Sequence, residues 1–155
     1  MQRRANQSHE LTLPEKRDAL VAEFSQIKGA PERMARVIEH GRRASLLEAE
    51  FKTDSHRVAG CLSNLWLVCS FTDGKCAFRC DSDSAIVKGI ATILCEFYSG
   101  HRPEEVLAID PEFLGPVGIT QHLTPNRRNA LSRVWETIRN FAQSHLPPGS
   151  QTPPP

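Results

Sequence analysis

The N-terminal third of the chain has apolar residues at helical spacing. A threonine followed closely by a proline predicts a helix start at Thr12, and Gly29 is expected to end this helix. Pro31 predicts the start of a second helix, which Gly41 is expected to end. The side chains predicted to face the core from these two helices are Leu20, Val21, Phe24, Ile27, Met34, Val37 and Ile38.

The middle of the chain alternates in a way that predicts a β-hairpin. Its strands cover 65–71 and 76–80, and Asp73-Gly74 between them favours a two-residue type I′ turn. The resulting register pairs Phe71 with Cys76, and one face of the hairpin becomes entirely apolar. That face carries Leu65, Leu67, Cys69, Phe71, Cys76, Phe78 and Cys80. An apolar sheet face has to be covered, which predicts helices packed on it.

Helical patterns return after the hairpin. Ser82 or Asp83 is expected to cap a long amphipathic helix that Gly100 stops, and Thr124 with Pro125 predicts the start of the last helix. The predicted fold class is α+β, with a small antiparallel β-sheet packed against helices on one side. Residues 12–145 form the predicted domain, 1–11 are expected to be a flexible N-terminal arm, and 146–155, LPPGSQTPPP, a disordered proline-rich tail.

Composition narrows the class of protein. The 155 residues are 39% hydrophobic and 24% charged, which is typical of one globular domain. No apolar run is long enough for a membrane span, and the N-terminus lacks a secretory signal, so a cytoplasmic protein with reduced thiols is expected. Basic residues are not interleaved with aromatic ones, so no nucleic-acid partner is expected. Acids concentrate in 81–112 and arginines in 127–139, which suits either a protein partner or unrelated solvated faces.

Four of the five cysteines are predicted to be structural. A zinc site needs thiolates within roughly 4 Å of one another, whereas Cys76 and Cys80 on one strand stand ~13 Å apart. We therefore expect no metal, and we assign Cys69, Cys76 and Cys80 to the core. Cys95 lies off the main apolar stripe of its predicted helix and has no partner at metal spacing, so a structural or incidental role is expected.

Cys61, in the segment VAGCLSNLW, differs from the other four. It precedes the first strand, Gly60 allows the backbone to turn, and Ser63 and Asn64 offer groups that stabilise a thiolate. His56 and Arg57 lie upstream, where positive charge would lower the thiol pKa. These features favour a reactive thiol. A Cys–His hydrolase using Cys61 with His122 or His56, and a purely structural interaction domain, both remain open.

Three segments carry a family resemblance. RVAGCLSNLWLV, DSDSAIVKGI and TQHLTPNRRNAL resemble, in order and spacing, the signature blocks of SufE-type sulfur acceptor proteins. The likeness covers roughly residues 12–145 and implies the fold shared by SufE and the IscU scaffold. It implies that Cys61 is the persulfide acceptor, that Asp83 lies near a partner surface, and that His122 and Arg127 lie beside the cysteine loop. Leu62 departs from the pattern, because many relatives have glutamine there.

The resemblance also implies a function. The protein would take persulfide sulfur from a pyridoxal-phosphate-dependent cysteine desulfurase of the SufS kind, stimulate that enzyme, and pass the sulfur to an iron–sulfur cluster assembly scaffold. It would need no cofactor of its own, because pyridoxal phosphate (PLP) belongs to the desulfurase. The expected role is that of a sulfur-transfer partner rather than a stand-alone enzyme.

Overall fold

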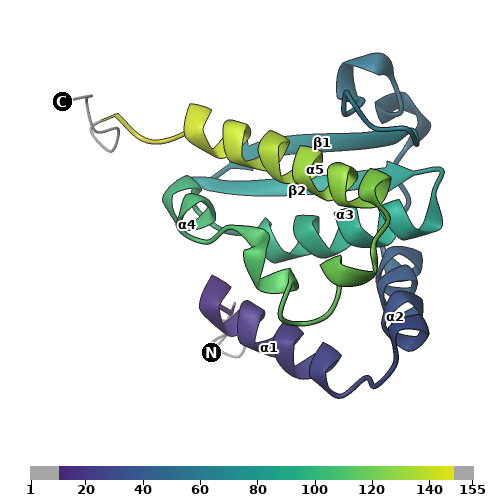
Figure 1. Ribbon diagram of the computed structural model, residues 1–155. Helices are drawn as coiled ribbons and strands as arrows, with labels where there is room; N and C mark the ends of the chain where they lie inside the picture. The colour runs from purple at the N-terminus through teal and green to yellow at the C-terminus, as the bar shows by residue number, and fades with distance from the viewer. Residues whose placement is uncertain (1–10, 149–155) are drawn as a thin grey trace, which may run out of the picture.

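A computed structural model of the protein describes residues 11–148, so most of the predicted arm and tail lies outside the described residues. Figure 1 shows a hairpin with helices packed against it. The α-helices and strands are α1 (Leu13–Ser25), α2 (Ala30–Arg43), β1 (Leu65–Thr72), β2 (Lys75–Ser82), α3 (Ala85–Tyr98), α4 (Pro103–Ala108) and α5 (Pro125–Ser144). Short 3-10 turns are η2 (Ala49–Phe51), η3 (Asp54–His56), η4 (Pro111–Leu114) and η5 (Thr120–His122).

The hairpin has the predicted register. β1 and β2 are antiparallel, with Thr72 opposite Lys75 and Leu65 opposite Ser82. Asp73 and Gly74 both have positive φ, 54° and 79°, as a type I′ turn requires. Phe71 differs from the expectation, because it is 39% exposed at the turn end of the hairpin. Its ring lies against His145 with centroids 4.7 Å apart instead of entering the core.

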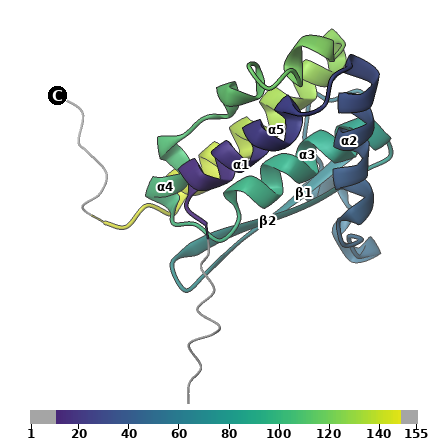
Figure 2. The same cartoon turned by 90° about the horizontal axis from the view of Figure 1, so that it is seen from below.

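Helix α3 is the centre of the molecule. It packs along β2 and contacts α1, α2 and α5, as Figures 1 and 2 show. Its N-cap is Ser84, whose hydroxyl accepts a bond from the Val87 amide at 3.3 Å. The predicted cap at Ser82 or Asp83 was therefore wrong by one or two residues. The buried residues of α3 are Val87, Gly89, Ile90, Ala91, Thr92, Ile93, Leu94, Cys95, Phe97 and Tyr98. The α+β class with a sheet packed against helices is confirmed.

Two glycines set the spacing of α2 and α3. Gly41 does not end α2, as predicted, but lies inside it, where an added Cβ would come within 3.0 Å of the Gly89 backbone. A Cβ on Gly89 would lie only 2.2 Å from the Val37 carbonyl oxygen. The absence of side chains lets the two backbones touch. Gly29 was also misassigned, because α1 ends at Ser25 and Gly29 is the N-cap of α2.

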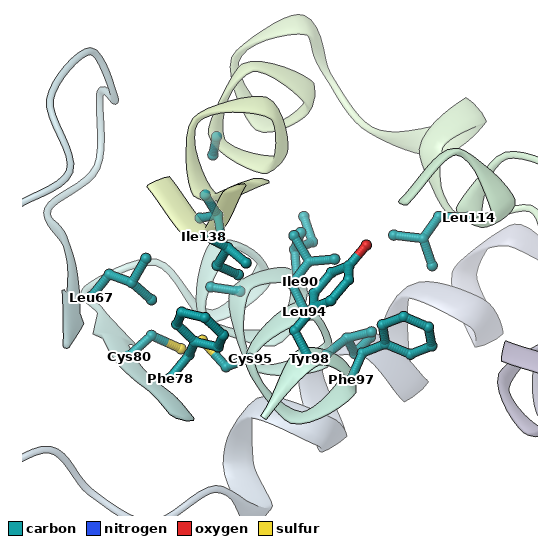
Figure 3. Packing of buried hydrophobic residues seen from close by; sticks show 14 of the residues in the cluster. Leu67, Phe78, Cys80, Ile90, Leu94, Cys95, Phe97, Tyr98, Leu114 and Ile138 are labelled. Atoms are coloured by element: carbon teal, nitrogen blue, oxygen red, sulfur yellow. The ribbon is translucent and has the colours of Figure 1, made fainter. Parts of the chain in front are cut away.

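The core fills the space between the hairpin and the helices. Figure 3 shows part of it, with Cys80 from β2 and Cys95 from α3 among aromatic and aliphatic side chains. Cys76 and Cys80 are buried and Cys69 is half-buried, in line with their assignment to the core. Cys95, predicted to lie off the apolar stripe, is buried as well. Val21, predicted to face the core, is 37% exposed. Within residues 11–148 no group of three metal-binding side chains comes together, and no helix is long and apolar enough to cross a membrane.

Truncation of a buried cysteine tests the core assignment. Cys76→Ala is expected to lower the free energy of unfolding by about 1 kcal/mol, because it removes a fully buried sulfur. Urea denaturation measures this loss. Cys69→Ala, at a half-buried position, is expected to cost less. The rate at which iodoacetamide alkylates Cys61 should stay the same, and a changed rate at unchanged stability would contradict a purely structural role for Cys76.

Candidate functional site: a thiol between two depressions

Cys61 lies in a loop, residues 59–64, that leaves η3 and enters β1. Backbone bonds close the base of this loop. The Val58 amide donates to the Leu65 carbonyl at 2.8 Å, and Arg57 forms an isolated bridge with Trp66. The loop is therefore held at its ends by the edge of the hairpin, while Cys61 occupies its middle.

Asp83 anchors the end of the loop through Asn64. One Asp83 carboxylate oxygen accepts from the Asn64 amide at 3.1 Å, and the other accepts from the Asn64 side-chain nitrogen at 3.0 Å. The Ser82 hydroxyl also donates to the Asn64 carbonyl at 2.7 Å. The Asn64 side chain, expected to stabilise a thiolate, is thus bonded to Asp83. Asp83, predicted to lie near a partner surface, positions the cysteine loop.

Gly60 meets helix α5. Its φ of +85° is a conformation that side chains other than glycine rarely adopt, and an added Cβ would lie 2.9 Å from the Arg133 Nε atom. Its carbonyl accepts a bond from the Asn129 side chain at 2.8 Å. Asn129 and Arg133 were not singled out from the sequence. They lie one helical turn apart on α5, and only the packing of α5 on the loop brings them to Gly60.

Two depressions open beside Cys61, which lines both. The first, of about 340 Å³, combines the loop with the first turns of α3 and α5, and its walls include Ser63, Ser84, Val87 and Arg127. The second, of about 300 Å³, is lined by Asp54, Arg57, Val58, Ala59 and Gly60 as well as Cys61. Cys61 therefore lies where two depressions meet the surface loop.

The side chain after the cysteine projects into solvent. Leu62 is 80% exposed, and it lines the first depression beside the half-buried Cys61. A large apolar side chain at this exposure is a feature of surfaces that contact partners when it belongs to a wider patch. Here it lies next to Cys61 in the same depression, so a partner that buried Leu62 would also cover Cys61.

Burial and charge act on the thiol in opposite directions. Burial raises the pKa of Cys61, and the Arg133 guanidinium acts to lower it. The expected lowering of the Cys61 pKa by His56 and Arg57 was therefore wrong: the pKa is raised, and the cation that acts to lower it is Arg133 of α5. His56 lies with its Nδ1 atom 3.3 Å from the Thr53 hydroxyl and its ring against Phe51.

Comparison with known proteins places the chain in a family. Residues 18–142 match the family described as "SufE: Fe-S metabolism associated domain". The chain belongs to the SufE family. It is therefore associated with iron–sulfur metabolism.

Curated SufE-like relatives are identical to this chain at 27–32% of the aligned residues. The chain is 32% identical over 131 residues to SufE-like protein 1, chloroplastic/mitochondrial, of Arabidopsis thaliana, covering 84% of this chain but only 35% of that protein. It is 30% identical over 135 residues to an uncharacterized SufE-like protein of Rhizobium meliloti, covering 84% of this chain and 96% of the relative. A Synechocystis SufE-like protein is 27% identical, with 84% and 82% covered.

A solved structure confirms the fold. The solution structure of a hypothetical protein from Thermus thermophilus superimposes with a TM-score of 0.71, covering 87% of this chain and 98% of that one. At 20% identity this likeness concerns the fold alone. The fold of this chain thus occurs in a solved protein as well.

The structure brings together some of the predicted site residues. Gly60, Ser63 and Arg127 surround Cys61 in the two depressions, and Asp83 lies at the base of the loop. His122 is exposed in η5 and lines neither depression. Among the residues that the structure describes, no histidine lines the space beside Cys61, so a Cys–His hydrolase gains no geometric support.

Removal of the Arg133 charge should make Cys61 harder to ionise. Arg133→Gln is expected to shift the pH at which iodoacetamide alkylation is half-maximal upward, because the guanidinium lowers the Cys61 pKa. At neutral pH alkylation should slow severalfold. Arg139→Gln makes the same charge change at an exposed position of α5. It should leave the pH dependence of Cys61 alkylation unchanged. Equal profiles for wild type and Arg133→Gln would show that the charge does not act on the thiol.

Proposed function

We propose that Cys61 accepts persulfide sulfur from a PLP-dependent cysteine desulfurase of the SufS kind, and that the protein stimulates this enzyme and passes the sulfur to an iron–sulfur scaffold. The observation that carries the proposal is the position of the thiol. Cys61 occupies a glycine-flanked loop, lines two depressions and has an exposed Leu62 beside it. A thiol on such a loop can enter the active site of another protein, whereas one on a buried strand face cannot.

The reaction is a thiol–persulfide exchange. The Cys61 thiolate attacks the outer sulfur of the persulfide on the desulfurase, a new S–S bond forms on Cys61, and the desulfurase cysteine leaves as a thiolate. Arg133 supports the anionic form of Cys61. The chemistry needs no cofactor or metal on this chain, and the PLP stays with the desulfurase. It requires reduced thiols, which is consistent with a cytoplasmic location.

The raised Cys61 pKa has a consequence for a carrier. Because burial favours the protonated thiol, the free protein holds its nucleophile in the less reactive form. This limits loss of the thiol to oxidants between encounters. Docking on the desulfurase then has to change the surroundings of the thiol so that Cys61 ionises. This behaviour fits a carrier that does not react without its partner.

Mass mapping tests the proposal. After incubation with desulfurase, PLP and cysteine, the protein should gain one sulfur atom that is absent when cysteine is omitted. Trypsin places Cys61 and Cys69 on one peptide, 58–75, so fragmentation of that peptide has to assign the sulfur to residue 61. Extra sulfur on Cys69 or Cys95 would contradict the assignment. Hydrolysis of a model ester by the protein alone would favour the hydrolase.

Charge reversal at the depression tests the partner surface. Arg127 lines the first depression, so Arg127→Glu is expected to weaken association with the desulfurase about tenfold at low salt and less at high salt. Titration calorimetry at two salt concentrations measures the difference. Lys28→Glu reverses an exposed charge between α1 and α2, away from both depressions, and should have little effect. Equal losses for the two variants would indicate only general long-range attraction.

A further inference from the structure

Two thiols outside the Cys61 site face each other in the core. Cys80 comes from β2 and Cys95 from α3, and Figure 3 shows their sulfur atoms side by side between the strand and the helix. Each thiol shifts the pKa of the other, and the Cys80 sulfur lies 3.7 Å from the Thr92 hydroxyl.

The two thiols differ in how readily they ionise. Hydrogen bonds from Cys95 and Thr92 lower the pKa of Cys80, and Lys88 acts in the same direction, against the burial of the thiol and the charge of Asp81. The same bond to Cys80 raises the pKa of Cys95, together with burial and the charges of Cys69 and Glu96. Cys80 therefore ionises first while Cys95 keeps its proton. By contrast, the pKa values of Cys69 and Cys76 are both raised to about 11, with burial the larger cause.

A depression leads to the pair from the surface. It has a volume of about 230 Å³, and both cysteines line it with Ala44, Ser45, Arg79 and Thr92 among its other walls. Both thiols are more than nine-tenths buried, so only a small reagent can reach them through it. Hydrogen peroxide has the required size. The fully buried Cys76 does not line this depression.

We propose that Cys80 and Cys95 are a redox modification site and form an intramolecular disulfide when the protein meets hydrogen peroxide. The Cys80 thiol first releases its proton, and the thiolate attacks one peroxide oxygen. The O–O bond breaks, Cys80 becomes a sulfenic acid, and the other oxygen leaves as hydroxide, which takes up the released proton to give water. The Cys95 sulfur then attacks the Cys80 sulfur, the S–S bond forms, the S–O bond breaks and a second water leaves. Peroxide takes the two electrons that the two thiols lose, and a dithiol reductant reverses the change.

Tryptic digestion can detect this disulfide directly. Trypsin cleaves after Arg79 and Lys88, which separates Cys80 on peptide 80–88 from Cys95 on peptide 89–127 and from Cys76 on peptide 76–79. The full-length protein, with reductant removed, is treated with hydrogen peroxide, unfolded in N-ethylmaleimide and digested without reduction. We expect peptides 80–88 and 89–127 to be recovered as one disulfide-linked species in most molecules, and dithiothreitol to separate them.

Several outcomes decide against the proposal. Recovery of both peptides separately with maleimide on each cysteine, oxidation of Cys80 to a sulfinic acid without a link, or a link of either peptide to 58–75 would overturn it. Cys76→Ala removes a buried thiol outside the depression and should keep the link. Cys95→Ser should leave Cys80 as a sulfenic acid that dimedone labels once the protein is unfolded in its presence. The mapping on the wild-type chain decides the question even if Cys95→Ser fails to fold. Sulfur transfer is not used as a readout, so the result is independent of the proposed function.

Discussion

Cys61→Ser is expected to abolish sulfur acceptance and the stimulation of the desulfurase while leaving the complex of the two proteins intact. Serine keeps the size of the side chain and the conformation of the loop, but its hydroxyl is not ionised near neutral pH and cannot hold a persulfide. Persulfide formation should fall by at least ~100-fold, as for the loss of other nucleophiles. Mass spectrometry measures the sulfur, an alanine-production assay measures desulfurase turnover, and calorimetry measures binding.

Cys69→Ser is the matched control for this experiment. Cys69 is also a half-buried thiol, and it shares a tryptic peptide with Cys61, but it stands on β1 and lines neither depression. The control variant should accept sulfur at the wild-type level. Full stimulation of the desulfurase by Cys61→Ser would show that the Cys61 thiol is not the sulfur acceptor. Loss of binding by that variant would mean that serine changes the conformation of the loop.

Gly89→Ala is expected to produce the largest loss of stability. The new methyl group would lie 2.2 Å from the Val37 carbonyl oxygen and 2.8 Å from the Val37 carbonyl carbon, so α2 and α3 have to move apart. Separation of two packed helices disturbs the core along their whole contact. We expect the free energy of unfolding to fall by about 3 kcal/mol, in the upper range for overpacked cores, and urea denaturation followed by circular dichroism measures it.

Gly115→Ala provides the comparison. A Cβ at Gly115 meets its nearest atom, the Glu112 carbonyl oxygen, at 3.4 Å, which is an ordinary contact, and its φ of −63° suits alanine. This variant should change stability by less than ~1 kcal/mol, because alanine only restricts the unfolded chain further. If Gly89→Ala were as mild as Gly115→Ala, the close approach of α2 and α3 would not be required for the fold.

Sequence alone was least reliable where a glycine has more than one possible use. Gly29 and Gly41 were both predicted to end helices, yet one begins α2 and the other lies inside it against Gly89. A glycine that stops a helix and one that admits a neighbouring backbone look alike in the sequence. Whether another helix crosses at that point depends on residues almost fifty positions away along the chain.

The sequence by itself determined the features that arise within a few residues. The Asp73-Gly74 turn determines the hairpin register, Thr124 with Pro125 starts α5, and the setting of Cys61 after Gly60 marks the candidate thiol. Turn and cap chemistry act between near neighbours, so they can be read locally. Only the tertiary structure decided which side chains meet across the chain. The contacts of Gly60 with Asn129 and Arg133 and the pairing of Cys80 with Cys95 depend on how α5 and α3 pack, because packing of whole elements decides which of their faces touch.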